Sequence, residues 1–226
     1  MNKLASLLIL SAAPLHAATV IIDNAHHSAV VTTGSQSSFG RQSFTFTVAG
    51  GTAGNGSSHD TVTANSPLTA LVTLESISFV ESPTDNASAT AGQLFLKVFS
   101  DAGATSAPVA ISTNSINVRG AIDGGALSDL TWSFASVSLS SVPEYFIRWS
   151  TNSTNDNTGL GVGRVAAANF GGGFVNTYTG GIATNPTGGA LAFDSRFEVT
   201  FATIPEPAAG LLALFAGAAL TRRRRA

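Results

Sequence analysis

Apolar side chains stand at every second position in three separate segments of the chain, residues 43–48, 145–150 and 196–201. The apolar positions are Phe44, Phe46 and Val48, then Tyr145, Ile147 and Trp149, then Phe197, Val199 and Phe201. A two-residue period is typical of a strand that buries one face. Each of the three segments is therefore predicted to form a β-strand.

Other strands are indicated by longer apolar runs. Residues 94–99 are apolar on both faces apart from Lys97, as in a central strand. Within residues 68–80 the apolar phase shifts after Leu74, and within residues 132–139 it shifts after Phe134. A β-bulge, or a break between two strands, is predicted at each shift.

Clusters of Gly, Asn and Asp separate these runs, and residues 18–204 contain no convincing 3.6-residue period with helix caps. Many short strands with such turns predict an all-β domain. We expect an antiparallel β-sandwich, jelly-roll-like in its connections, over residues 18–203.

The N-terminus has the three parts of a secretory signal peptide. Lys3 supplies a positive charge, residues 4–10 are apolar, and small residues follow. Cleavage is expected between Ala17 and Ala18, so residues 1–17 form the predicted signal peptide. A buried helix of the mature fold is the alternative, but Pro14 interrupts the segment early.

The C-terminus joins three features in order. The sequence Pro205, Glu206, Pro207 precedes an apolar run over residues 208–220, and Arg222, Arg223, Arg224 and Arg225 follow it. The run has no polar side chain, which favours a single membrane helix with the arginines on the cytoplasmic side. Thirteen residues span only about 20 Å, so length alone favours a buried helix with a basic tail. A nucleic-acid-binding tail is disfavoured because the rest of the chain is not basic.

This layout resembles the PEP-CTERM sorting signal of Gram-negative bacteria, over residues 204–226 only. The resemblance implies recognition at Pro205, Glu206 and Pro207 by an exosortase, a membrane-embedded transpeptidase-like enzyme. The inner membrane would hold the protein transiently through the helix. The body would then pass to the cell surface or outside the cell, in association with exopolysaccharide or biofilm.

Composition changes this picture in two ways. The chain has no cysteine, which excludes disulfides, thiolate catalysis and cysteine-ligated metal sites. Its formal net charge is −2, but residues 18–204 carry six basic and twelve acidic side chains, a net charge of −6. An acidic exported body argues against nucleic acid as a partner.

Candidate catalytic and metal-binding groups are weak in the sequence. Ser58, His59 and Asp60 are the residue types of a hydrolase triad, but triads are assembled from distant segments. His26 and His27 would point to opposite faces of a strand, which suits one metal ion poorly. The acids Glu75, Glu81 and Glu144 cannot be paired without a structure. We therefore predict no enzyme and no resident cofactor.

Two ligand sites are left open. Asn152, Asn155, Asp156 and Asn157 form an oxygen-rich segment that would suit calcium, although Asx-rich turns are common without metal. Among the Trp and Tyr residues, Tyr178 is expected to be exposed, and Trp132, Tyr145 and Trp149 are expected in the core. Tyr178 is thus the candidate for glycan contact.

We expect an exported structural or adhesive protein of the surface or matrix. A lectin-like carbohydrate-binding module is the first alternative, and a secreted polysaccharide-degrading enzyme is the second.

Overall fold

The computed structural model of the protein describes residues 19–23, 36–45, 61–64, 71–82, 90, 92–118, 128–140, 144–167, 169–170, 173–174 and 181–203. These residues form antiparallel strands and contain no helix, so the all-β prediction is confirmed. The predicted signal peptide and the sorting helix at 208–220 lie outside the described residues. Within the described part, no helix has the length and hydropathy to cross a membrane.

The first large sheet has five strands in the order β4-β1-β16-β5-β9. Their bounds are β1 Thr19–Asp23, β4 Thr61–Ala64, β5 Leu71–Val80, β9 Asp129–Ser140 and β16 Phe197–Thr203. The first and last of these strands in the sequence pair antiparallel, with Thr19 opposite Ala202. The chain thus enters and leaves this sheet at the same end.

The second large sheet has seven strands, of which five follow the order β15-β3-β10-β6-β7. The remaining two, β11 and β8, pair with β10 and β6. Their bounds are β3 Arg41–Phe44, β6 Gln93–Phe99, β7 Ala110–Ile111, β8 Ile116–Asn117, β10 Tyr145–Ser150, β11 Leu160–Gly161 and β15 Ala183–Thr184.

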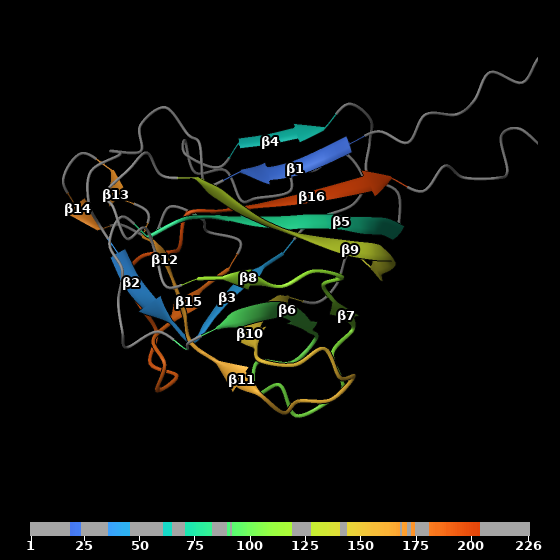
Figure 1. The fold of residues 1–226 in the computed structure, drawn as a ribbon. Coiled ribbons are helices and arrows are strands. Elements are labelled where there is room, and N and C mark those ends of the chain that lie inside the picture. Colours follow the sequence, from blue (N-terminus) through green and yellow to red (C-terminus); the bar gives the residue numbers. More distant parts are fainter. Residues whose placement is uncertain are drawn as a thin grey trace, which may run out of the picture.

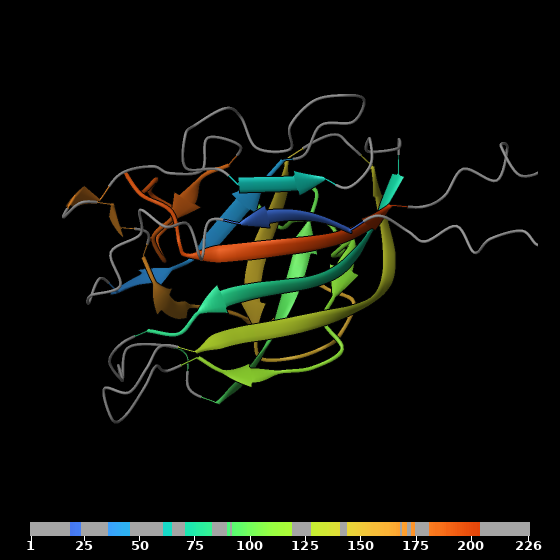
Figure 2. The ribbon, with the colours of Figure 1, turned by 90° about the horizontal axis from the view of Figure 1, so that it is seen from above.

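Two small sheets complete the set, β12 Gly163–Ala166 with β2 Gln36–Phe39, and β13 Asn169–Phe170 with β14 Gly173–Phe174. Figure 1 shows the two large sheets as layers, one above the other. In the view from above, the strands of the second sheet run across those of the first (Figure 2).

The core lies between the two large sheets. Phe79 of β5 packs against Trp149 of β10 with ring centroids 5.1 Å apart, and Phe44 of β3 lies 6.0 Å from Phe201 of β16. All four rings are fully buried. Full burial of such a side chain contributes about 1.5–3 kcal/mol, so these rings anchor the two layers to each other.

The apolar alternation correctly predicted the inner faces. Tyr145, Ile147 and Trp149 are buried on β10, and Phe197, Val199 and Phe201 are buried on β16. The segment 94–99 forms β6, which has neighbours on both sides, as predicted. In the segment predicted from residues 43–48, β3 ends at Phe44, and Phe46 and Val48 lie outside the described residues.

The predicted phase shifts are β-bulges within continuous strands. Leu74 of β5 pairs with Val137, but Ser76 pairs with Ser133, so β9 has extra residues between the two pairs. One of them, Ser136, has a φ of 39°. On the other side of β5, Glu75 is skipped between Phe201 and Thr200 of β16. An extra residue in one strand restores the inward direction of the apolar side chains that follow it.

Candidate functional site

Three basic side chains lie in a row across the outer face of the second sheet. On β10, Ile147 and Trp149 face the core, so Arg148 faces outward. Arg148 pairs with Lys97 of β6. On the other side, Ile147 pairs with Gln42 of β3, and one further step in this register brings Arg148 opposite Arg41. Half of the six basic residues of the region 18–204 thus stand side by side.

Lys97 is fully buried, and its ammonium group is surrounded by oxygen atoms of the loop 152–158. Its Nζ donates to Asn152 Oδ1 at 2.8 Å and to the backbone oxygens of Asp156 and Thr158 at 2.9 and 3.3 Å. The Asp156 carboxylate lies 3.4 Å away and is 45% exposed. The buried charge is therefore stabilised by hydrogen bonds to this loop and by one carboxylate.

The oxygen-rich segment considered for calcium is this same loop. Asn152 and Asp156 direct oxygens at Lys97, while Asn155 and Asn157 are exposed. An ammonium group from the protein itself therefore occupies the point at which the oxygens converge. The described residues contain no group of three or more His, Asp or Glu side chains placed to hold a metal ion.

Asp156 is held in its charged form by the same loop. The hydroxyl of Thr158 is the largest cause, followed by the Thr158 backbone N–H, and together with weaker contacts to Thr154 and Lys97 they lower the pKa of Asp156 to about 2. The two Thr158 hydrogen bonds measure 2.8 and 2.9 Å. The Lys97 ion pair is a minor contribution because its partner is solvated.

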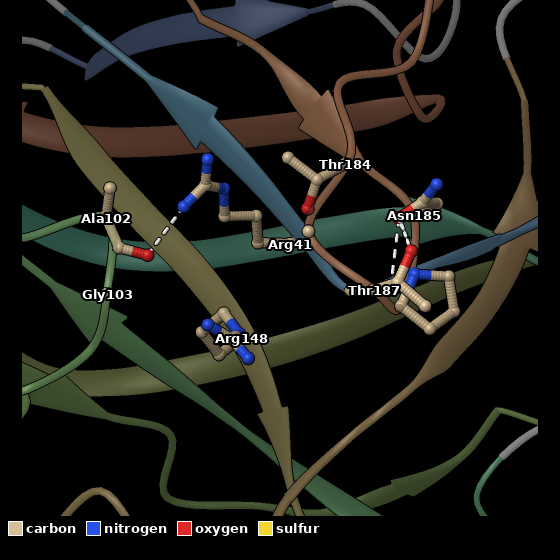
Figure 3. Close-up of a pocket in the computed structure, with 10 residues that line it drawn as sticks. Arg41, Ala102, Gly103, Arg148, Thr184, Asn185 and Thr187 are labelled. Carbon is tan, nitrogen blue, oxygen red and sulfur yellow. Dashed lines mark hydrogen bonds between the residues drawn. The ribbon is translucent and has the colours of Figure 1, made fainter.

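Beside Lys97, the row of basic side chains opens into a pocket of about 230 Å³. Its lining residues are Gly40, Arg41, Ala102, Gly103, Arg148, Thr184, Asn185, Pro186, Thr187 and Gly188. Figure 3 shows the two arginines on neighbouring strands, with the 102–103 loop on one side and the 184–187 turn on the other.

The turn that forms one wall is specified by its local sequence. Asn185, Pro186, Thr187 and Gly188 have the residue types of a type I turn followed by a left-handed glycine. Gly188 has a φ of +90°, and its N–H donates to the Asn185 backbone oxygen at 3.0 Å. The Asn185 side chain also accepts from Thr187 (Figure 3), and it accepts from the Gly189 N–H at 2.9 Å.

This turn is fixed to the sheet by Gly40. The N–H of Gly40 donates to Thr184 O at 2.8 Å. A Cβ at position 40 would lie 2.4 Å from Asn185 O, so the close approach requires glycine. The wall is therefore rigid relative to Arg41, the next residue in the chain.

The opposite wall is the loop 101–106, which Asp101 organises. Its carboxylate accepts the Thr105 N–H at 2.9 Å and the hydroxyl and N–H of Ser106. The Ser106 hydroxyl is the largest cause that lowers the pKa of Asp101 to about 2. These bonds hold Ala102 where its backbone oxygen accepts a 2.6 Å hydrogen bond from Arg41 (Figure 3).

Arg41 and Arg148 differ in how they are held. Arg41 bonds Ala102, and its guanidinium carbon lies 5.3 Å from the centre of the Phe146 ring, a cation–π contact. Among the described residues, Arg148 has no side-chain hydrogen bond or ion pair. The Nε atoms of both arginines are buried without a hydrogen-bond partner in the described structure. Burial, and then the charge of Arg41, lower the pKa of Arg148 below its ordinary value, because both disfavour the charged guanidinium.

The pocket is therefore a concave, positively charged site with hydroxyl and amide groups from Thr184, Thr187 and Asn185. Its ten described lining residues include no carboxylate and no histidine. It offers charged and polar groups for binding and orienting a ligand.

Most of the residues that the sequence predicted as site residues do not line this pocket. Trp132, Tyr145 and Trp149 are buried in the core, as predicted. A further group of predicted residues lies outside the described part, namely Ala17, Ala18, His26, His27, Ser58, His59, Asp60, Tyr178, Pro205, Glu206, Pro207, Arg222, Arg223, Arg224 and Arg225.

The three acids considered for hydrolysis have separate surroundings. Glu75 is exposed at the bulge of β5. Glu81 accepts a hydrogen bond from Ser128, and Glu144 accepts one from Ser43. None of them shares a hydrogen-bond partner with another in the described structure, and none lines the pocket.

Arg41 and Arg148 were not predicted as site residues. Alternation on β10 places Arg148 on the outer face, which was the only available signal. The pairing of β3 with β10 joins residues more than 100 positions apart, and the two loops that close around it contact β3 from 61 and 144 positions away.

Comparison with protein-family models, with curated proteins and with solved structures finds no match to this chain.

Proposed function

We propose that this protein is an exported structural or adhesive component of the cell surface or extracellular matrix, sorted by an exosortase. The observation that carries the proposal is the order of Pro205-Glu206-Pro207, the apolar run 208–220 and the four arginines. The acidic body, with its low content of charged residues, suits a role outside the cell.

The ends of the body support the proposal. β1 starts at Thr19 and β16 ends at Thr203. Removal of residues 1–17 and a cut at Pro205–Pro207 would therefore leave every described strand intact. Because β1 and β16 pair, both cuts would fall at one end of the body, and the membrane helix would tether the body by that end.

The strand orders support a β-sandwich of the jelly-roll type. The neighbours are β1-β16-β5-β9 in one sheet and β3-β10-β6-β7 in the other, an order that two interleaved Greek keys would produce. An exported chain without cysteine has no disulfides, so such a body would rely on the packing of its core.

A lectin-like module and a polysaccharide-degrading enzyme are the alternatives. A lectin that stacks sugars on aromatic rings would have to rely on residues other than Trp132, Tyr145 and Trp149, because these rings are buried. An enzyme would need paired acids, and Glu75, Glu81 and Glu144 have separate surroundings. Both alternatives are therefore less well supported than a non-enzymatic matrix role.

The test is a change in the sorting motif within the host. Replacing Pro205, Glu206 and Pro207 by alanine should leave the body in the membrane fraction, while the wild-type body reaches the surface or medium. Deleting the exosortase should give the same retention. Thr221→Ser, a conservative change in the same tail, is the control and should sort normally. Normal sorting of the triple variant would overturn the proposal.

A further inference from the structure

The pocket between β3 and β10 brings two positive charges together without a carboxylate. Arg41 and Arg148 stand on neighbouring antiparallel strands, and Lys97 continues the row on the third strand. Like charges that face each other across a strand pair destabilise a sheet. Asp156, the carboxylate that contacts the row, bonds Lys97 and is absent from the pocket lining.

The fold itself does not require the second charge. Arg41 holds the 101–106 loop through Ala102 O and covers Phe146, so it has a structural role. Arg148 has no such contact among the described residues, although it is partly buried. A partly buried guanidinium without a partner is destabilising, and a bound anion would offset this by forming charge-assisted hydrogen bonds with it.

The walls are suited to a ligand because they are fixed before it arrives. The turn 185–188 is closed by its own hydrogen bonds and packed against Gly40, and Asp101 closes the opposite loop. A rigid site lowers the ordering cost of binding. The volume of about 230 Å³ lies below the roughly 300 Å³ at which drug-sized ligand pockets begin. It therefore fits a single sugar-sized or smaller group.

We propose that this pocket binds an oxyanion group, a carboxylate or a sulfate, through the guanidinium groups of Arg41 and Arg148. Planar guanidinium groups recognise such anions by paired hydrogen bonds. Thr187 and Asn185, which also line the pocket, provide neutral polar groups for the remainder of the ligand, and Thr184 beside them is buried. The same anionic group is presented by a free small acid and by an acidic residue of a polysaccharide. Binding of this kind needs neither export nor sorting, so it stands apart from the function proposed above.

The experiment is a calorimetric titration of the full-length chain in mild detergent. The probes are sodium sulfate, sodium glucuronate and polygalacturonate, with glucose and dextran as neutral counterparts, all at matched ionic strength because salt screens charge. We expect the wild-type chain to bind glucuronate or sulfate and to ignore glucose and dextran. Binding of polygalacturonate with much higher affinity per acidic residue than glucuronate would identify the polysaccharide as the source of the anion. Equal affinity of polygalacturonate and glucuronate per acidic residue would identify a free small acid as the source of the anion.

The variants separate recognition from general charge. Arg148→Gln should weaken binding about tenfold or more, since a hydrogen bond to a charged group contributes about 1.5–3 kcal/mol. Arg148→Lys should retain part of the affinity as a point charge. Arg164→Gln is the matched control, because it removes the same charge from β12, where Arg164 bonds Ser38, and it should bind like wild type.

A thermal unfolding measurement without ligand excludes a merely structural effect. Arg148→Gln should melt no lower than wild type, because it removes a repulsive neighbour of Arg41. The proposal is overturned if no anion binds the wild-type chain, if glucose binds as well as glucuronate, or if Arg148→Gln binds as tightly as wild type.

Discussion

The ammonium nitrogen of Lys97 lies 2.8 Å from the side-chain oxygen of Asn152, and this contact ties strand β6 to the loop that follows β10. The loop continues to Gly159, whose backbone oxygen accepts the Thr151 N–H at 2.8 Å. A buried cation on one strand thus sets the shape of a loop that begins on the next strand. On one side of Arg148, the outer face of the second sheet carries Lys97 and its loop. On the other side lie Arg41 and the pocket.

Lys97→Met should lower the free energy of unfolding by about 1.5–3 kcal/mol, the contribution typical of hydrogen bonds to a charged group. The physical reason is that the oxygens of Asn152, Asp156 and Thr158 lose their shared donor. Urea denaturation measures the change. Asn152→Ala added to Lys97→Met should cost less than the two separate losses summed. Strict additivity would mean that the contact contributes nothing, and Ser153→Ala, an exposed change in the same loop, is the control.

Stability should fall in acid as the loop carboxylates are protonated. Asp156 and Asp101 each have a pKa lowered from 3.8 to about 2 in the folded protein. A lowered folded-state pKa gives stability that is fully present above about pH 4 and is lost as pH falls from about 4 to about 2. Urea denaturation midpoints measured between about pH 4 and about pH 2 test this loss of stability. The double variant Asp101→Asn, Asp156→Asn should have a flatter pH profile, and an unchanged slope would show that other groups dominate.

Gly163→Ala should destabilise the core by about 1–3 kcal/mol, as overpacking does. A Cβ at position 163 would lie 2.2 Å from Cε2 of Trp149, whose ring is fully buried. Trp149 must then move, so its fluorescence should change along with the unfolding midpoint. Gly103→Ala is the control, since its added Cβ would lie 3.2 Å from a Thr105 methyl at the surface. If both variants unfold alike, the contact with Trp149 is not tight in solution.

Asn114→Ala should expose the edge of the first sheet. The Asn114 side chain donates to Thr131 O at 2.9 Å and accepts from the Ser133 N–H at 2.8 Å, as a neighbouring strand would. Its loss should cost about 0.5–1.5 kcal/mol and increase aggregation, because an unpaired edge recruits other strands. Light scattering during slow heating measures the second effect. Asn117→Ala, at an exposed position of β8, should aggregate no faster than wild type.

Strands β3, β10 and β16 could be predicted because each carries its own two-residue period, and β6 could be predicted because its apolar run is continuous apart from Lys97. Even the bulges in β5 and β9 were visible as phase shifts, since an extra residue reverses the direction of every later side chain. The sheet neighbours were not predictable. The pairing of β3 with β10 joins residues 42 and 147, and nothing in either segment specifies the other.

The pocket was missed for the same reason. Arg41 and Arg148 are ordinary outward-facing residues in their own strands, and they form a site only when the two strands are neighbours. The segment with Asn152 and Asp156 was noticed for its oxygens, but sequence could not show that Lys97 supplies the cation. The oxygens of this segment do surround a cation, and that cation is the ammonium group of Lys97.

The most direct test of sorting is the intact mass of the protein recovered from the surface or medium of its host. We expect a chain that begins at Ala18 and ends within or next to Pro205–Pro207, with any acceptor adding to that mass. In a host without the exosortase, the mass should still include the tail to Ala226. A surface protein that ends at Arg225 or Ala226 in both hosts would contradict sorting by an exosortase.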